Sequence, residues 1–142
     1  MRNLFILVIM LDIAGFSACE QKLKESQVPS IVKAAFERAY PNTKATWDKE
    51  GEGYEGEFKK DGREMSVIID GSGNITETET MIAVTDLPVP ISDYMNKYYS
   101  GMKIEEAAKI IKASGDVNYE AEIKEKDIVF DANGNFLKEE KE

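Results

Sequence analysis

The second half of this 142-residue chain repeats the plan of its first half, and the repeat limits the possible folds more than any other feature. Three motifs occur twice in the same order: a segment with helical spacing that begins with Val-Pro or Leu-Pro, a Tyr-Glu-x-Glu segment, and an Asp-x-x-Gly-Asn turn followed by an apolar residue. They occupy residues 28–41, 54–58 and 70–75 in the first copy and 87–100, 119–123 and 131–136 in the second. Such self-similarity indicates two copies of one supersecondary unit. The sequence therefore predicts tandem units at 28–86 and 87–142.

The first copy is expected to contain one helix followed by four antiparallel strands. Pro29 suits the first turn of a helix and Pro41 ends it. Alternating apolar and charged side chains then indicate half-buried strands. The residues predicted to face inward from the helix are Val28, Val32, Ala35, Phe36 and Ala39, and the predicted strands are 44–50, 53–60, 63–70 and 75–84.

The second copy is expected to follow the same order from residue 87. Asn133-Gly134 favours a type I′ hairpin turn. The segment 103–113 is ambiguous, because its good helix formers recur at helical spacing while its place in the repeat matches a strand. We predict a strand there, since the repeat is the stronger constraint. The helix is predicted at 90–99, with Ile91, Tyr94, Met95 and Tyr98 inward, and further strands at 117–124, 127–131 and 135–140.

The composition excludes several kinds of chemistry. The chain has no histidine, which excludes histidine general bases and imidazole metal ligands. Its single cysteine excludes an intrachain disulfide and any zinc site built from several thiolates. A net charge of −9 disfavours nucleic acid and anionic membrane surfaces, and is compatible with a basic protein, a cationic peptide or a metal cation.

The amino terminus is typical of a secretory signal. Arg2 precedes the apolar run 4–11, which is too short to span a bilayer as a helix, and small residues follow it. Ser17 and Ala18 directly before the only cysteine resemble a bacterial lipobox. The sequence therefore predicts a signal peptide at 1–18, lipid attachment at Cys19, and a polar lipidated tether at 19–27. A plain secreted protein in which Cys19 is incidental is the alternative.

The repeated motifs resemble those of the PepSY-like family of secreted bacterial proteins, also called beta-lactamase-inhibitor-like. The resemblance covers nearly all of the chain after residue 27, although Ser100 stands where the first copy has Pro41. It implies an α+β fold in which a helix packs on an antiparallel sheet, duplicated so that the two sheets join side by side with the helices on one face. It also implies a binding or inhibitory module of the Gram-negative cell envelope, and it supplies no catalytic residues.

Two sets of acidic residues could form sites. Asp70-x-Ser72-x-Asn74 and its counterpart starting at Asp131 superficially resemble the start of a calcium loop, but Ile75 and Phe136 stand where such a loop requires glycine, so hairpin turns are the preferred interpretation. Glu77 and Glu79 alternate with threonines and share one strand face. Paired carboxylates can perform acid–base catalysis, but we expect this pair to line the solvated side of a strand.

The aromatic residues are expected at the helix–sheet interface; the alternative for a minority of them is the open sheet face, where they would be binding anchors. They are Trp47, Tyr54, Phe58, Tyr94, Tyr98, Tyr99 and Tyr119. The favoured function is a lipid-anchored envelope module, not an enzyme and without cofactor or resident metal, that captures a protein or peptide through an acidic sheet face and thereby inhibits an enzyme in some cases. The alternatives are a hydrolase that uses carboxylates alone and a calcium-binding structural protein.

Overall fold

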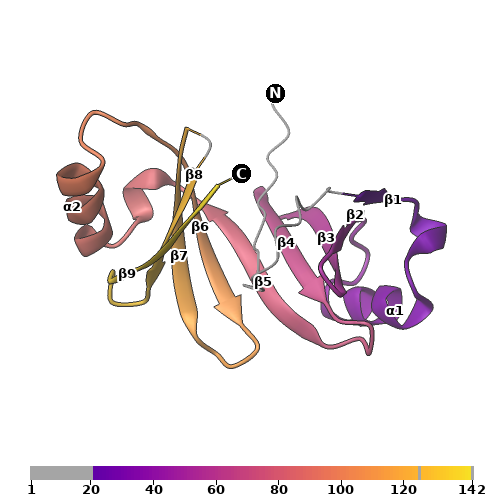
Figure 1. Cartoon of the computed structure of the whole chain (residues 1–142). Helices are drawn as coiled ribbons and strands as arrows, with labels where there is room; N and C mark the ends of the chain where they lie inside the picture. Colours follow the sequence, from indigo (N-terminus) through magenta and orange to yellow (C-terminus); the bar gives the residue numbers. More distant parts are fainter. Residues whose placement is uncertain (1–20, 125, 142) are drawn as a thin grey trace.

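The computed structural model describes residues 21–124 and 126–141, and its strands form one continuous sheet. Within these residues the sheet has nine strands that follow the chain order from β1 to β9, and every neighbouring pair is antiparallel. Figure 1 shows this sheet strongly twisted, with α1 and α2 near opposite ends of the molecule. The predicted mixed α+β class with antiparallel strands is confirmed.

The order of elements is similar in the two halves. In the first half these are β1 (Gln21–Leu23), the 3-10 helix η1 (Glu25–Gln27), α1 (Ser30–Ala39), β2 (Thr46–Glu50), β3 (Gly53–Lys60), β4 (Arg63–Ile69) and β5 (Ile75–Ile82). In the second half they are the 3-10 helix η2 (Val84–Asp86), α2 (Val89–Tyr98), β6 (Ile104–Lys112), β7 (Val117–Ile123), β8 (Lys126–Asp131) and β9 (Phe136–Lys141). The ambiguous segment 103–113 is therefore a strand, as predicted.

Both helices pack on the same face of the sheet. The register places Trp47 opposite Gly56 and Gly56 opposite Val67. Trp47 and Val67 form one buried cluster with Val32 and Phe36 of α1. A second cluster joins α2 to β6, β7 and β8, and its buried members are Leu87, Ile91, Met95, Ala107, Ala121, Ile123, Ile128 and Phe130. Burying this apolar area is the main source of the fold's stability.

The two Asp-x-x-Gly-Asn motifs form nearly identical hairpin turns. In each turn one carboxylate oxygen of the aspartate accepts the backbone N–H groups two and four residues later, at 2.8 and 2.9 Å. Gly73 and Gly134 have φ values of 84° and 83°. Asn133 is not in the positive-φ region, so the predicted type I′ turn is wrong. Each turn is instead a three-residue loop, in which the glycine adopts the left-handed conformation and the adjoining strand pair has a bulge.

Three further sequence-based expectations differ from the structure. Ala39 is exposed and Tyr98 is 58% exposed, because both lie in the last turn of their helices, where the chain leaves the sheet. Residues 21–23, within the expected tether, pair with β2 as β1, and Leu23 packs against the first core. The expected signal peptide and Cys19 lie outside the described residues. No helix in the described part of the chain has the length and apolar character needed to cross a membrane.

Candidate functional site

The sheet face opposite the helices gathers carboxylates from six strands. Directly opposed residues on neighbouring strands share a face, so the register gives its members. Asp48 lies opposite Glu55, Glu79 opposite Ser66, and Glu122 opposite Asp127. We call this surface the acidic face; its acidic members are Asp48, Glu55, Glu57, Glu77, Glu79, Glu120, Glu122, Asp127 and Glu140.

The acidic face is concave. Asp127 lies three strands from Glu79, which would be about 14 Å along a flat sheet at the usual strand spacing. Its charge nevertheless contributes to the raised pKa of Glu79, as does the charge of Glu55 from the other side. Carboxylates from β3, β5 and β8 are therefore close enough for their charges to interact.

Glu79 and Glu120 are the most deeply buried glutamates of this face. Their exposed fractions are 4% and 3%. Burial raises the pKa of both carboxyls well above the ordinary value, and the neighbouring carboxylates raise it further. Because like charges in such proximity cannot all ionise in a poorly solvated setting, these two groups hold protons far more firmly than surface glutamates do.

Glu55 and Glu77 follow the same trend. Burial raises the pKa of Glu55 to about 8, with smaller contributions from Glu57, Glu50 and Asp48, while a hydrogen bond from Ser66 opposes the rise. Burial also raises the pKa of Glu77, and the charges of Lys112 and Lys138 oppose it. The acidic face thus contains carboxyls that stay partly protonated near neutral pH.

Several oxygens of this face have no hydrogen-bond partner among the described residues. They are Oε1 of Glu77, Oε1 of Glu79, Oε2 of Glu120, Oε2 of Glu140 and both carboxylate oxygens of Asp48. Lys22 Nζ lies 3.5 Å from the Asp48 carboxylate, so that group still has an ion pair. Buried polar atoms without partners cost folding free energy. Residues that destabilise the folded state in this way occur mainly at functional sites.

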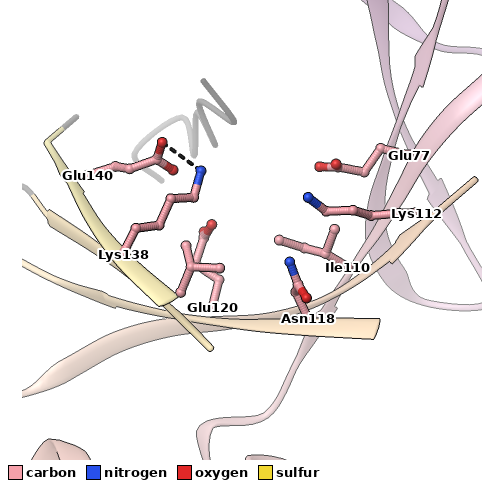
Figure 2. Close-up of a pocket in the computed structure, with 8 residues that line it drawn as sticks. Glu77, Ile110, Lys112, Asn118, Glu120, Lys138 and Glu140 are labelled. Atoms are coloured by element: carbon pink, nitrogen blue, oxygen red, sulfur yellow. Dashed lines mark ion pairs between the residues drawn. The ribbon is translucent and has the colours of Figure 1, made fainter. Parts of the chain in front are cut away.

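A small hollow lies at one end of the acidic face, between β5, β6, β7, β8 and β9. Its space amounts to about 230 Å³ including the open mouth, and the enclosed part has room for about one water-sized group. Figure 2 shows Glu77 and Glu140 on opposite sides of it, with Glu120 between them. Small-molecule sites usually measure about 300–1,000 Å³, so this hollow suits the end of a side chain better than a free substrate.

Comparison with known proteins places this architecture in a family. The family model described as "putative beta-lactamase-inhibitor-like, PepSY-like" matches residues 17–77 and again residues 67–138. The chain belongs to the PepSY-like family. No curated protein sequence matches this PepSY-like chain.

Solved structures share the fold of this PepSY-like chain at low sequence identity. A DUF2874 family protein from Bacteroides uniformis has a TM-score of 0.72 at 18% identity, covering 80% of this chain and 89% of its own. A "putative periplasmic" protein from Bacteroides eggerthii has a TM-score of 0.72 at 14% identity, with coverage of 80% and 88%. A BLIP-like protein from Bacteroides fragilis has a TM-score of 0.63 at 21% identity, with coverage of 80% and 85%.

The sequence analysis placed Glu77 and Glu79 correctly on one strand face but misjudged their surroundings. Both side chains are buried, so the expectation that they line a solvated surface is wrong. The physical reason is the curvature of the sheet, which brings side chains of distant strands over β5. Asp48, Glu55, Glu120 and Asp127 were missed. The Tyr-Glu-x-Glu motif could have located Glu55 and Glu120, because alternation places these carboxylates opposite the core tyrosine.

The aromatic side chains mostly occupy the helix–sheet interface, as expected. Tyr54 and Tyr119 pack against the two cores from equivalent strands. Tyr98 is exposed on α2, and its ring lies 4.4 Å from that of Tyr94. The alternative, a minority on the open sheet face, does not apply to these residues, because Tyr98 is a helix residue and the others belong to or pack against the two cores.

The calcium-like motifs are hairpin turns, the interpretation that the sequence favoured. The Asp70 and Asp131 carboxylates each accept two backbone N–H groups and the side-chain amide of Asn74 or Asn135. These donors lower the pKa of both aspartates. In the described part of the chain, no group of three Asp, Glu or Cys side chains has an arrangement that could hold a metal ion.

Proposed function

We propose that this PepSY-like chain is a non-enzymatic binding module that captures a basic segment of a protein or peptide on its acidic face. Inhibition of an enzyme would follow where the captured segment borders an active site. The family's inhibitor-like description and the BLIP-like structural relative support this class of function.

One observation carries the proposal: buried carboxylates with unpartnered oxygens lie on a concave sheet face that no described helix covers. Removing a carboxylate from water is costly unless a cation or hydrogen-bond donor compensates. A basic partner would supply both, because its Lys and Arg side chains carry positive charge and several N–H donors. The unbound module would thus hold an unfavourable arrangement that binding relieves.

The module is further proposed to act in the cell envelope of a Gram-negative bacterium, tethered through lipid on Cys19 after removal of 1–18. The lipobox-like residues and the periplasmic description of one structural relative support this location. The proposed duplication, with copies at 28–86 and 87–142, is supported by the two tandem family matches.

The proposal is tested with an unstructured twelve-residue peptide that contains six lysines. Its affinity is measured by fluorescence anisotropy at low and at physiological salt. We expect binding that weakens with salt and that falls about tenfold or more in the triple variant E57Q/E79Q/E120Q.

The matched control makes the same number of acid-to-amide substitutions on surfaces away from the acidic face. Glu25, Glu37 and Asp93 are exposed on η1, α1 and α2, so E25Q/E37Q/D93N should bind the peptide nearly as well as the unmodified protein. Equal loss in both triple variants would mean that only net charge matters, and the proposed binding face would be rejected.

A further inference from the structure

The hollow at the end of the acidic face has features that the rest of the face lacks. Three oxygens without hydrogen-bond partners border it, and each comes from a different strand: Glu77 Oε1 from β5, Glu120 Oε2 from β7 and Glu140 Oε2 from β9. Glu120 is 3% exposed, so its free oxygen is a buried acceptor and not a surface group. Figure 2 shows the three carboxyl groups arranged around one opening.

The charged groups that line the hollow include more carboxyl groups than ammonium groups. Lys138 Nζ lies 2.7 Å from the other oxygen of Glu140, and Lys112 lies opposite Glu77 in the strand register. The lining thus combines three carboxyl groups with two ammonium groups. Burial raises the pKa of Glu77 and Glu120, so a cation that enters the hollow would favour loss of their protons. With all three carboxyls ionised, one negative charge is left for a single cationic group to neutralise.

The size and shape of the hollow restrict that cation. The enclosed space accommodates about one water-sized group, which matches a primary ammonium, whereas a planar guanidinium would have to stay in the open mouth. An ammonium carries three N–H donors and can therefore pair with carboxyl oxygens on more than one side of the hollow. A bare metal ion fits less well, since the described acidic side chains include no group of three arranged to hold one.

The apolar part of the lining suits the stem of such a group. Ile110 and Val129 are 2% and 3% exposed and border the hollow beside the carboxyl groups. A lysine side chain buries its methylene stem against apolar surface while its charged end reaches polar partners.

We infer that this hollow is a specificity pocket for the ammonium group of one lysine side chain on the captured partner. This inference rests on the proposed function and adds to it a preference for lysine over arginine. The preference is unusual, because guanidinium groups normally form the stronger bidentate pairs with carboxylates.

The test compares the six-lysine peptide with a peptide of the same length in which every lysine is arginine. We expect the unmodified protein to bind the lysine peptide several-fold more tightly. E120Q and, separately, E77Q keep the shape of the side chain and remove an anionic acceptor, so each should abolish the preference, with about a tenfold loss for the lysine peptide.

The matched control is E57Q, on the acidic face but outside the hollow. It should weaken both peptides equally and leave the preference for lysine intact. Two results would overturn the lysine pocket and leave the acidic binding face in place. The first is an unmodified protein that binds both peptides equally or prefers arginine. The second is a preference for lysine that survives E120Q and E77Q. Failure of both peptides to bind overturns the proposed function itself.

Discussion

Gly73 and Gly134 occupy the same place in the two hairpin turns, and each lies against the first turn of a helix. A Cβ atom at position 134 would lie 2.7 Å from Pro90 Cβ, and one at position 73 would lie 3.0 Å from Ile31 Cγ1. Both glycines also have positive φ. Each half of the chain therefore uses one glycine both to close its last hairpin and to let that hairpin touch its helix.

Replacing Gly134 with alanine should lower the free energy of unfolding by about 2–3 kcal/mol, because a left-handed backbone and a steric clash add together. Urea denaturation measures the change. Gly115 is the matched control, since it has a φ of 88° and no atom of the described residues lies within 4 Å of the position that a Cβ would take there. We expect G115A to cost about 1 kcal/mol. Equal losses in the two variants would show that the contact with Pro90 is unimportant.

At the scale of elements, the two helices differ in how they use their aromatic residues. In α1, Phe36 makes edge contacts with Trp47 and Phe58 at ring separations of 5.4 and 5.1 Å. The corresponding position in α2 is Met95, and Tyr94 instead stacks on Phe136 at 5.5 Å. The second helix is thus anchored by buried aliphatic side chains, with aromatic rings at its margin.

Replacing Met95 with alanine should cost about 2–4 kcal/mol, because a buried side chain leaves a cavity. Replacing Tyr98 with alanine should cost less than about 1 kcal/mol, since that ring is mostly exposed. Urea or thermal denaturation of the two variants measures both losses of stability. A larger loss for Y98A would restore the inward orientation that helical spacing predicted.

The repeat allowed most elements to be predicted, and non-local geometry explains what was missed. Position in the repeat identified β6 correctly against a helical pattern, because pairing with both β5 and β7 outweighs local propensity. The three-residue strand β1 is too short to produce an alternating pattern. The raised pKa of Glu79 depends in part on charges from strands well away along the sheet, so the surroundings of the candidate site could not be predicted from β5 alone.

At the scale of the whole molecule, the two cores differ in the sheet residues that lie beneath the helices. Trp47 lies over Gly56 in the first half, where a Cβ atom would come within 3.0 Å of the ring. The equivalent layer in the second half pairs Ala107 with Ala121. The first half thus fills this layer with one large residue beside glycine, and the second half with two small residues. The continuous acidic face on the other side spans both halves, so it belongs to the whole sheet and not to either copy.

That face also determines how stability should depend on pH. Glu55, Glu77, Glu79 and Glu120 have raised pKa values, so above pH 4.5 the folded state binds more protons than the unfolded state. Their contribution is complete below about pH 4.5 and is lost as pH rises through the folded pKa, which is about 8 for Glu55. Asp70 and Asp131 have lowered pKa values and act in the opposite sense, so their contribution is lost as pH falls below about 4.

We therefore expect the free energy of unfolding to be greatest near pH 5 and to fall between pH 5 and pH 8, by about 1.4 kcal/mol per pH unit for each carboxyl that is protonated only in the folded state. Urea denaturation at half-unit pH steps measures the slope. E79Q should reduce the slope and raise stability at pH 8, while the exposed E64Q should change neither. High salt screens surface repulsion but not buried groups, so the slope should persist in 1 M salt. A flat profile between pH 5 and pH 8 would mean that these carboxyls are solvated and ionised, and the face could then attract a cation only as an ordinary acidic surface does.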